Sequence, residues 1–142
     1  MLIREFRQGR CLVARLDHGM NIIAQITDLA VEKEIETGFL SVIGALIRAE
    51  LGYYDQVSQK YIKIQIDEPV ELVSCSGNVS LRDGKPFVHA HAVLSDREGK
   101  VWGGHLTSGP VFAAELYMQE LLGLHLKRMP DSITGLNLWG EE

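Results

Sequence analysis

Residues 87–106, FVHAHAVLSDREGKVWGGHL, predict two β-strands joined by a tight turn. Residues 97–99 have the sequence Arg-Glu-Gly, which fits a three-residue hairpin loop with Gly99 in the left-handed position. This loop makes Asp96 the partner of Lys100 and sets the pairing of the strands on either side. We therefore expect an antiparallel hairpin with a defined register.

The predicted register gathers three histidines. Counting outward from the turn places His91 opposite His105. His89 shares the face of His91, because every second side chain of a strand points the same way, roughly 6.5–7 Å further along. A shift by one residue would send His105 to the opposite face, so the prediction depends on the turn.

Three neutral imidazoles form a ligand set that suits zinc and leaves the fourth position of its tetrahedron open. We predict a zinc site at His89, His91 and His105, although ligand type alone does not exclude nickel, copper or iron. The alternative is that the histidines only form structural hydrogen bonds. Gly103 and Gly104 predict either the close approach of a ligand or backbone, or a bulge.

Two cysteines lie in apolar, strand-like segments without Cys-x-x-Cys spacing, so we expect buried free thiols and no disulfide framework. These are Cys11 and Cys75. If residues 82–84 also close a three-residue hairpin loop, Cys75 lies opposite His91 and becomes a candidate fourth ligand or neighbour of the metal.

Length and composition favour a single domain over residues 1–142, with 46% hydrophobic residues. The formal net charge of −5 comes from 14 Lys and Arg against 19 Asp and Glu, and excludes a general attraction of the whole surface to nucleic-acid phosphate. The chain shows neither a signal peptide nor an apolar run near the ~20 residues of a membrane span. We expect a cytoplasmic protein without membrane contact.

The remaining patterns predict an α+β fold, with one long amphipathic helix packed on a mainly antiparallel β-sheet. Apolar positions recur at helical spacing from Asn21 to about Thr37, where Gly38 predicts the stop. The predicted strands are residues 10–16, an antiparallel pair formed by 39–54 with 61–66, then 70–81, and two short strands within 124–128 and 136–139.

Residues 110–120 are ambiguous between helix and strand. Propensity favours a helix, whereas the alternation of Ala114, Leu116 and Met118 with polar residues suits a half-buried strand. In the strand interpretation Glu115 could point toward the histidines and orient an imidazole or act as a general base; an ordinary surface glutamate is the alternative.

Several of these segments together resemble the PPC domain, which plants and prokaryotes share and which was formerly a domain of unknown function (DUF296). The resemblance covers nearly the whole chain and rests on the helix after Asp17-His18-Gly19, on Val42-Ile43-Gly44-Ala45, on His89-Ala90-His91, on residues 96–99, and on Gly103-Gly104-His105-Leu106 through Ala114-Glu115. It implies a compact sandwich-like fold, a strand at residues 110–120, a homotrimer and a DNA-binding role. A more distant resemblance to the acetolactate decarboxylase fold implies strand histidines that hold a zinc ion.

The resemblance and the residues together predict a DNA-binding or regulatory module with a three-histidine zinc site. A metal-dependent lyase or hydrolase and a purely structural metal site are the alternatives. The residues themselves offer DNA only Arg4, Arg7, Arg10 and Arg15, because the basic Arg-Gly-Arg-Pro core of the AT-hook found in plant relatives is missing. For an enzyme, the sequence shows no set of substrate-binding arginines near the histidines.

Overall fold

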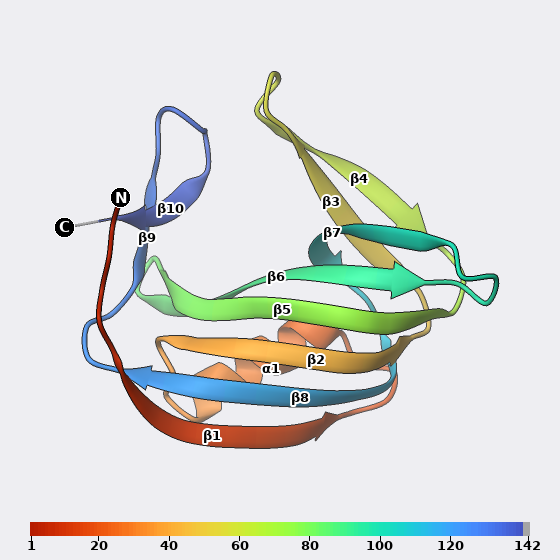
Figure 1. Ribbon diagram of the computed structural model, residues 1–142, viewed down its shortest axis with the longest axis horizontal. Helices are drawn as coiled ribbons and strands as arrows, with labels where there is room; N and C mark the ends of the chain where they lie inside the picture. Colours follow the sequence, from red (N-terminus) through yellow and green to blue (C-terminus); the bar gives the residue numbers. More distant parts are fainter. Residues whose placement is uncertain (141–142) are drawn as a thin grey trace.

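The computed structural model describes residues 1–140, and Figure 1 shows them as a curved sheet with one helix, α1 (Ile22–Glu32). The strands are β1 (Arg7–Leu16), β2 (Gly38–Leu46), β3 (Ala49–Asp55), β4 (Lys60–Ile66), β5 (Val70–Arg82), β6 (Lys85–Ser95), β7 (Val101–Ser108), β8 (Val111–Leu122), β9 (Lys127–Pro130) and β10 (Asn137–Gly140). The described part of the chain contains no helix with the length and apolar character needed to span a membrane.

The strands follow the order β1-β8-β2-β5-β6-β7-β3-β4, and all neighbours on this path are antiparallel. β9 joins β5 through a single parallel pair, Leu81 with Lys127, and β10 pairs with β9. The α+β fold with a mainly antiparallel sheet is therefore confirmed, as are the two short strands near the end. Residues 39–54 form two strands, β2 and β3, and only β3 pairs with β4, so the predicted pair is confirmed for its second half alone.

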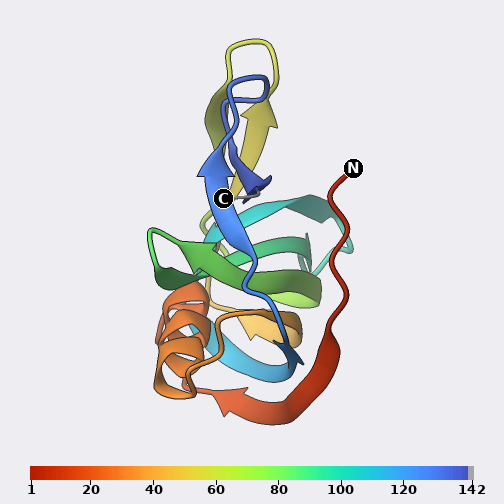
Figure 2. The same cartoon turned by 90° about the vertical axis from the view of Figure 1, so that its left-hand side faces the viewer.

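The core lies between α1 and the concave face of the sheet (Figure 2). From the helix, Ile22, Ile26 and Ala30 are fully buried there. Every second residue of β6 is also buried, from Val88 to Leu94. Burying a valine, leucine or isoleucine side chain contributes about 1.5–3 kcal/mol. The alternating burial of β6 therefore fixes which face of the strand points inward. The histidines of β6 occupy the intervening positions and point away from this core.

The helix is shorter than the predicted span of residues 21–37. It ends at Glu32 because Glu34 takes a left-handed conformation, with φ of 55°. The N–H of Ile35 then turns back to donate to the carbonyl of Ala30 at 2.8 Å, a Schellman closure of the helix end. The sequence pattern predicted a longer helix because Ile35, which lies beyond the helix end, is also buried in the core.

Residues 110–120 form a strand, as the resemblance implied, and not the helix that propensity favours. β8 is hydrogen-bonded along both edges, to β1 and to β2. Ala114, Leu116 and Met118 are buried in alternation with exposed neighbours. Pairing on both sides outweighs the few tenths of a kcal/mol per residue that helix propensity offers.

Two hairpins rise from the sheet on the same side, one made of β3 and β4 and the other of β9 and β10; we call them the two arms (Figure 1). The arms touch near their tips. The hydroxyl of Tyr54 donates to the carbonyl of Thr134 at 2.6 Å, and the amide of Gln59 donates to the carbonyl of Ile133 at 2.9 Å. The arms thus form an arch above the part of the sheet that carries the histidines.

Candidate metal centre

The hairpin of β6 and β7 has the register predicted from its turn. Gly99 has φ of 81°, and the N–H of Asp96 donates to the carbonyl of Lys100 at 3.0 Å. His91 consequently lies directly opposite His105. Because one short loop sets this pairing, the approach of the two imidazoles was derivable from sequence alone.

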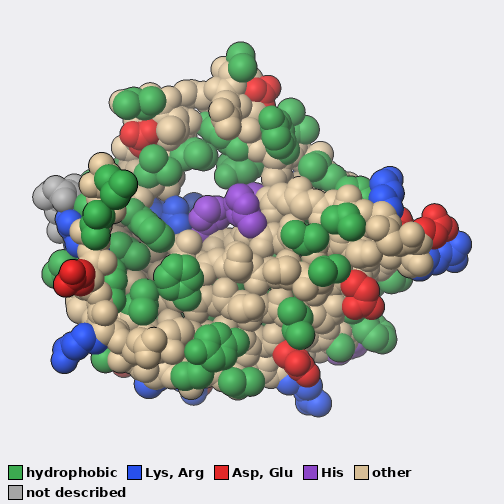
Figure 3. Space-filling view, in the orientation of Figure 1, with side chains coloured by type: hydrophobic (Ala, Val, Ile, Leu, Met, Phe, Trp, Pro, Cys, Tyr) green, Lys and Arg blue, Asp and Glu red, His purple; other side chains and the backbone are tan. Residues whose placement is uncertain are grey.

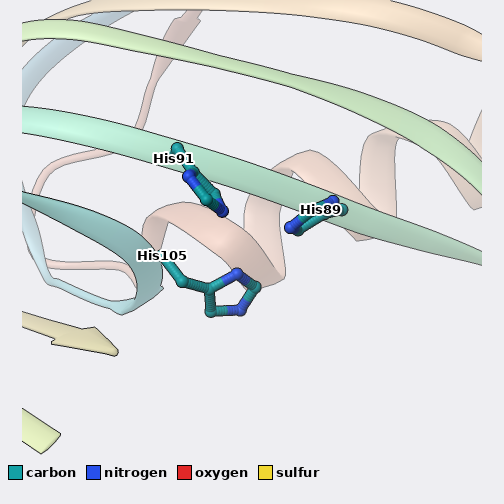
Figure 4. A group of neighbouring side chains, drawn as sticks. All are labelled: His89, His91 and His105. Atoms are coloured by element: carbon teal, nitrogen blue, oxygen red, sulfur yellow. The ribbon is translucent and has the colours of Figure 1, made fainter. Parts of the chain in front are cut away.

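His89, His91 and His105 point into a common space, and we call them the histidine cluster (Figure 4). One nitrogen from each ring lies within 4.8 Å of the nitrogens chosen from the other two. The ring centroids are 5.1 Å apart for His89 with His91, 5.1 Å for His89 with His105, and 5.6 Å for His91 with His105. No acidic or thiol side chain of the described residues joins this group.

The cluster fits a divalent metal ion. The Nδ1 atom of His105 is buried and has no hydrogen-bond partner among the described residues, a situation that costs about 1–3 kcal/mol when nothing compensates it. Burial, followed by the nearby charge of Arg128, lowers the pKa of His89 to about 4, and burial also lowers the pKa of His105. Both rings are therefore neutral near pH 7, the form in which an imidazole binds a metal.

Gly104 allows β7 to lie close to β3, next to the cluster. A Cβ atom at this position would lie 2.9 Å from the carbonyl oxygen of Gly52. At Gly103 the nearest atom would be 3.6 Å away, an ordinary contact. The pairing of β6 with β7 continues through both glycines without a shift, so backbone approach, and not a bulge, explains Gly104.

A cavity of about 550 Å³ lies between the histidine cluster and the two arms. Figure 3 shows its opening under the arch, with histidine visible at the edge. Its lining combines aromatic, apolar, amide and cationic side chains: Tyr54, Gln56, Gln59, Tyr61, Arg82, Phe87, His89, His91, His105, Arg128, Gly135, Leu136, Asn137 and Leu138. None of these described residues is an aspartate or glutamate.

Arg128 also lines the cavity, and the sequence did not predict its place there. Its Nη2 atom lies 3.3 Å from Nδ1 of His89 and 3.0 Å from the side-chain oxygen of Asn78. Its Nε donates to the hydroxyl of Ser80 at 2.8 Å, and Nη1 donates to the carbonyl of Asn137 at 3.1 Å. These contacts connect β9 to the floor of the cavity. They arise from the docking of β9 on β5, which no local pattern signals.

A second arginine lines the same cavity. The Cζ atom of Arg82 lies 3.9 Å from the ring centroid of Phe87, and that of Arg128 lies 5.4 Å from it. Burial, followed by the charge of Arg82, lowers the pKa of Arg128. The sequence showed no set of arginines near the histidines, whereas the structure places Arg82 and Arg128 in the lining of the same cavity.

Cys75 does not join the cluster, because the turn before β6 has two residues instead of three. Asp83 and Gly84 both have positive φ, 53° and 73°, as in a type I′ turn. The register therefore moves by one, which places Ser76 opposite His91. Cys75 is buried on the core side, and this burial raises its pKa to about 11. The other thiol, Cys11, is exposed and not buried as predicted.

Glu115 also lies away from the histidines. It is an exposed residue of β8 and pairs with Arg15 of β1 and with Ile43 of β2. Strands β2 and β5 separate β8 from β6, and Glu115 is not among the residues that line the cavity. The alternative of an ordinary surface glutamate is the one the structure bears out.

The fold and this site define a member of a known domain class. The family description that matches residues 3–122 is the Plants and Prokaryotes Conserved (PCC) domain, also abbreviated PPC. The match covers most of the chain, so the chain belongs to this family.

Solved structures show the same fold. A metal-containing protein from Archaeoglobus fulgidus is 44% identical, with a TM-score of 0.96 over 99% of this chain and 100% of that chain. A plant- and prokaryote-conserved protein from Pyrococcus horikoshii is 40% identical, with a TM-score of 0.94 over 100% of this chain and 99% of that chain. A proposed DNA-binding protein from Ralstonia eutropha is 25% identical, with a TM-score of 0.81 over 92% of this chain and 90% of that chain.

Among curated proteins, the bifunctional protein GlmU of Synechococcus is 32% identical over 124 residues, which are 85% of this chain. The match spans only 19% of the length of that protein.

Proposed function

We propose that the histidine cluster binds one zinc ion per chain and leaves a coordination position open toward the cavity. The observation that carries this proposal is the convergence of three imidazoles within 4.8 Å, one with a buried nitrogen that has no hydrogen-bond partner among the described residues. Zinc accepts three histidine ligands and an exchangeable fourth ligand in catalytic sites. The relative from Archaeoglobus fulgidus, described as metal-containing, supports it.

The open cavity favours a metal-dependent lyase or hydrolase acting on a small molecule over a purely structural metal site. Its volume of about 550 Å³ is within the range of small-molecule sites. When bound, zinc would polarise a carbonyl or lower the pKa of bound water, and three neutral ligands would leave its charge undiminished. Around it the chain supplies Arg128 beside His89, and the ring of Tyr61 at 5.3 Å from that of His105.

The first test is the metal content of the purified protein, measured by elemental mass spectrometry. We expect about one zinc per chain, and its loss in His89→Ala, His91→Ala and His105→Ala. His125→Ala is the matched control, because His125 pairs with Glu36 outside the cluster. Absence of zinc from the wild-type protein after incubation with zinc would contradict the proposal.

A second measurement separates an open site from a structural one. Cobalt(II) in place of zinc gives a visible spectrum that reports its ligands. Addition of azide is expected to change this spectrum when one position is exchangeable. A spectrum that azide leaves unchanged would favour four protein ligands and a structural role.

DNA binding is a second candidate, and the relative from Ralstonia eutropha is the observation that favours it. On this chain, Arg15 is exposed on β1 and Arg7 begins that strand, whereas Arg10 is held by Glu120. We expect any binding of duplex DNA to weaken steeply with salt and to fall in an Arg7→Ala, Arg15→Ala double variant. Fluorescence anisotropy would measure it, with Arg97→Ala as a control; no binding at low salt would exclude it.

We also propose that the chain assembles as a homotrimer, as the family resemblance implies. The sheet face opposite α1 exposes apolar side chains on several adjacent strands, among them Val13, Phe39, Ile43, Val93 and Tyr117. Figure 3 shows such side chains on this face. Exposed apolar side chains that gather on one face are typical of an association surface.

A further inference from the structure

The guanidinium of Arg128 is half-buried beside the histidine cluster, and its hydrogen-bond partners among the described residues are all uncharged. They are an amide oxygen, a hydroxyl, a backbone carbonyl and the imidazole of His89. A positive charge that is partly removed from water is stable when an anion accompanies it. The described residues around the cavity provide no carboxylate for this purpose.

The contact between Arg128 and His89 cannot persist when a metal is bound. A guanidinium only donates hydrogen bonds, so Nδ1 of His89 must accept in the 3.3 Å contact. A neutral imidazole has a single nitrogen lone pair available for accepting. If the metal takes Nε2, then Nδ1 carries the proton; if the metal takes Nδ1, it displaces Arg128 directly. Either arrangement frees one N–H of Arg128 to face another acceptor.

The charge of the cavity is opposite to that of the whole chain. The chain has a formal net charge of −5, yet the cavity is lined by two arginines and three histidines without an acidic side chain among the described residues. The guanidinium groups of Arg82 and Arg128 both lie close to the ring of Phe87. A divalent ion would add two further positive charges. The local field therefore attracts an anion.

We propose that the cavity binds a small organic acid whose carboxylate is shared between the bound metal and Arg128, with Arg82 as a second cationic contact. This inference rests on the proposed zinc site. The carboxylate would take the donor of Arg128 that metal binding releases from His89. Phe87, Leu136 and Leu138 line the same cavity and suit an apolar or aromatic body next to the acid group.

The shared carboxylate predicts reciprocal coupling between the two ligands. Zinc frees Arg128 for the acid, and the acid compensates the charges that zinc and the arginines bring together. By linkage, each ligand must raise the affinity for the other by the same factor. Charge-assisted hydrogen bonds contribute enough for a change of roughly 10- to 100-fold.

Benzoate is the probe, because it has one carboxylate, an aromatic body and little ability to remove zinc. Calorimetric titration of zinc-loaded protein is expected to show benzoate binding roughly 10-fold or more tighter than in metal-free protein. Benzamide, the neutral counterpart, should not bind, and inorganic phosphate tests whether any oxyanion suffices. Equal affinity for phosphate and benzoate would overturn the assignment to an organic acid.

The variant Arg128→Met should lose at least about 10-fold in benzoate affinity while it retains zinc. The matched control is Arg97→Met, an exposed arginine of the β6–β7 turn. In case Arg128→Met does not fold, the zinc affinity of the wild-type protein, measured against a fluorescent chelator with and without benzoate, tests the same coupling. If zinc binds and neither affinity depends on the other ligand, the inference is wrong and the zinc site stands. If no zinc binds, both are wrong.

Discussion

The missing side chain of Gly104 determines how closely the third histidine of the cluster approaches the neighbouring strand. β7 carries His105 one residue further on, and β3 packs against it with the carbonyl of Gly52 facing position 104. A methyl group there would meet backbone, which cannot rotate away. The position of His105 therefore depends on its neighbour having no Cβ.

Gly104→Ala is expected to destabilise the protein by about 1–3 kcal/mol, because the strand pair β3–β7 must separate to accept the methyl group. Its zinc affinity should fall together with the free energy of unfolding. Gly103→Ala is the matched control, since its new Cβ would meet nothing closer than 3.6 Å. Urea denaturation compares the two variants, and equal stability would show that β7 adapts freely.

The histidine cluster was predictable because its geometry depends on one turn. Gly99 defines the length of the loop, which sets the register of His91 with His105. The two-residue period of a strand then places His89 on the same face as His91. The same reasoning was wrong for Cys75, where the turn could be closed by two residues or by three. Asp83 has a positive φ of 53°, which a two-residue loop requires and the predicted three-residue loop does not. A turn predicts register only when its length is known.

At the scale of elements, β1 is fastened to β8 by an ion pair as well as by backbone pairing. The side chain of Glu120 is buried. Its carboxylate accepts hydrogen bonds from Nε and Nη2 of Arg10 at 2.8 and 2.7 Å, and from the backbone N–H of Arg10 at 2.9 Å. These hydrogen bonds, the side-chain ones first, lower the pKa of Glu120 from 4.5 to about 2. The folded state therefore favours the ionised carboxyl group.

The contribution of Glu120 to stability should be complete above pH 4.5 and should disappear as the pH falls toward about 2. Glu120→Gln should lower the free energy of unfolding near neutral pH and flatten its decline over that acidic range. Glu115→Gln, exposed on the same strand, is the control. Urea denaturation at a series of pH values makes the comparison. A decline as steep in Glu120→Gln as in the wild type would contradict the prediction.

The two arms are elements whose placement could not be predicted from sequence. The strand patterns of β9 and β10 were visible, but their docking above the histidines was not, because one parallel pair and the contacts of Arg128 fix it. Such contacts join residues far apart in the chain and leave no periodic signal. The floor of the cavity was therefore predictable, whereas its cationic wall was not.

Tyr54→Phe should loosen the arch without damaging the sheet. It removes the hydroxyl that donates to Thr134, a bond of about 0.5–1.5 kcal/mol. Amide hydrogen exchange in β9 and β10 should then become roughly 2- to 10-fold faster, while exchange in β2 and β5 stays unchanged. Tyr53→Phe is the control, because Tyr53 is exposed on the same strand. Unchanged exchange in the arm would mean that other contacts hold it.

At the scale of the whole molecule, the apolar sheet face predicts self-association. Light scattering coupled to size-exclusion chromatography should give three times the chain mass of 15.8 kDa. Ile43→Lys, in the middle of that face, should shift the protein toward the monomer because a buried unpaired charge is costly. Val57→Lys, at the turn between β3 and β4, should leave the mass unchanged. A monomeric wild-type protein would contradict the proposed homotrimer.

The location of all three histidines in one hairpin also bears on how the protein folds. Closing a short loop costs little entropy, so β6 and β7 can pair before strands that are distant in sequence pair with each other. The cluster can thus assemble early, whereas Arg128 reaches it only after β9 docks on β5. A metal ion present during folding would stabilise the paired β6–β7 hairpin. The cavity above the histidines would form last, when β9 docks.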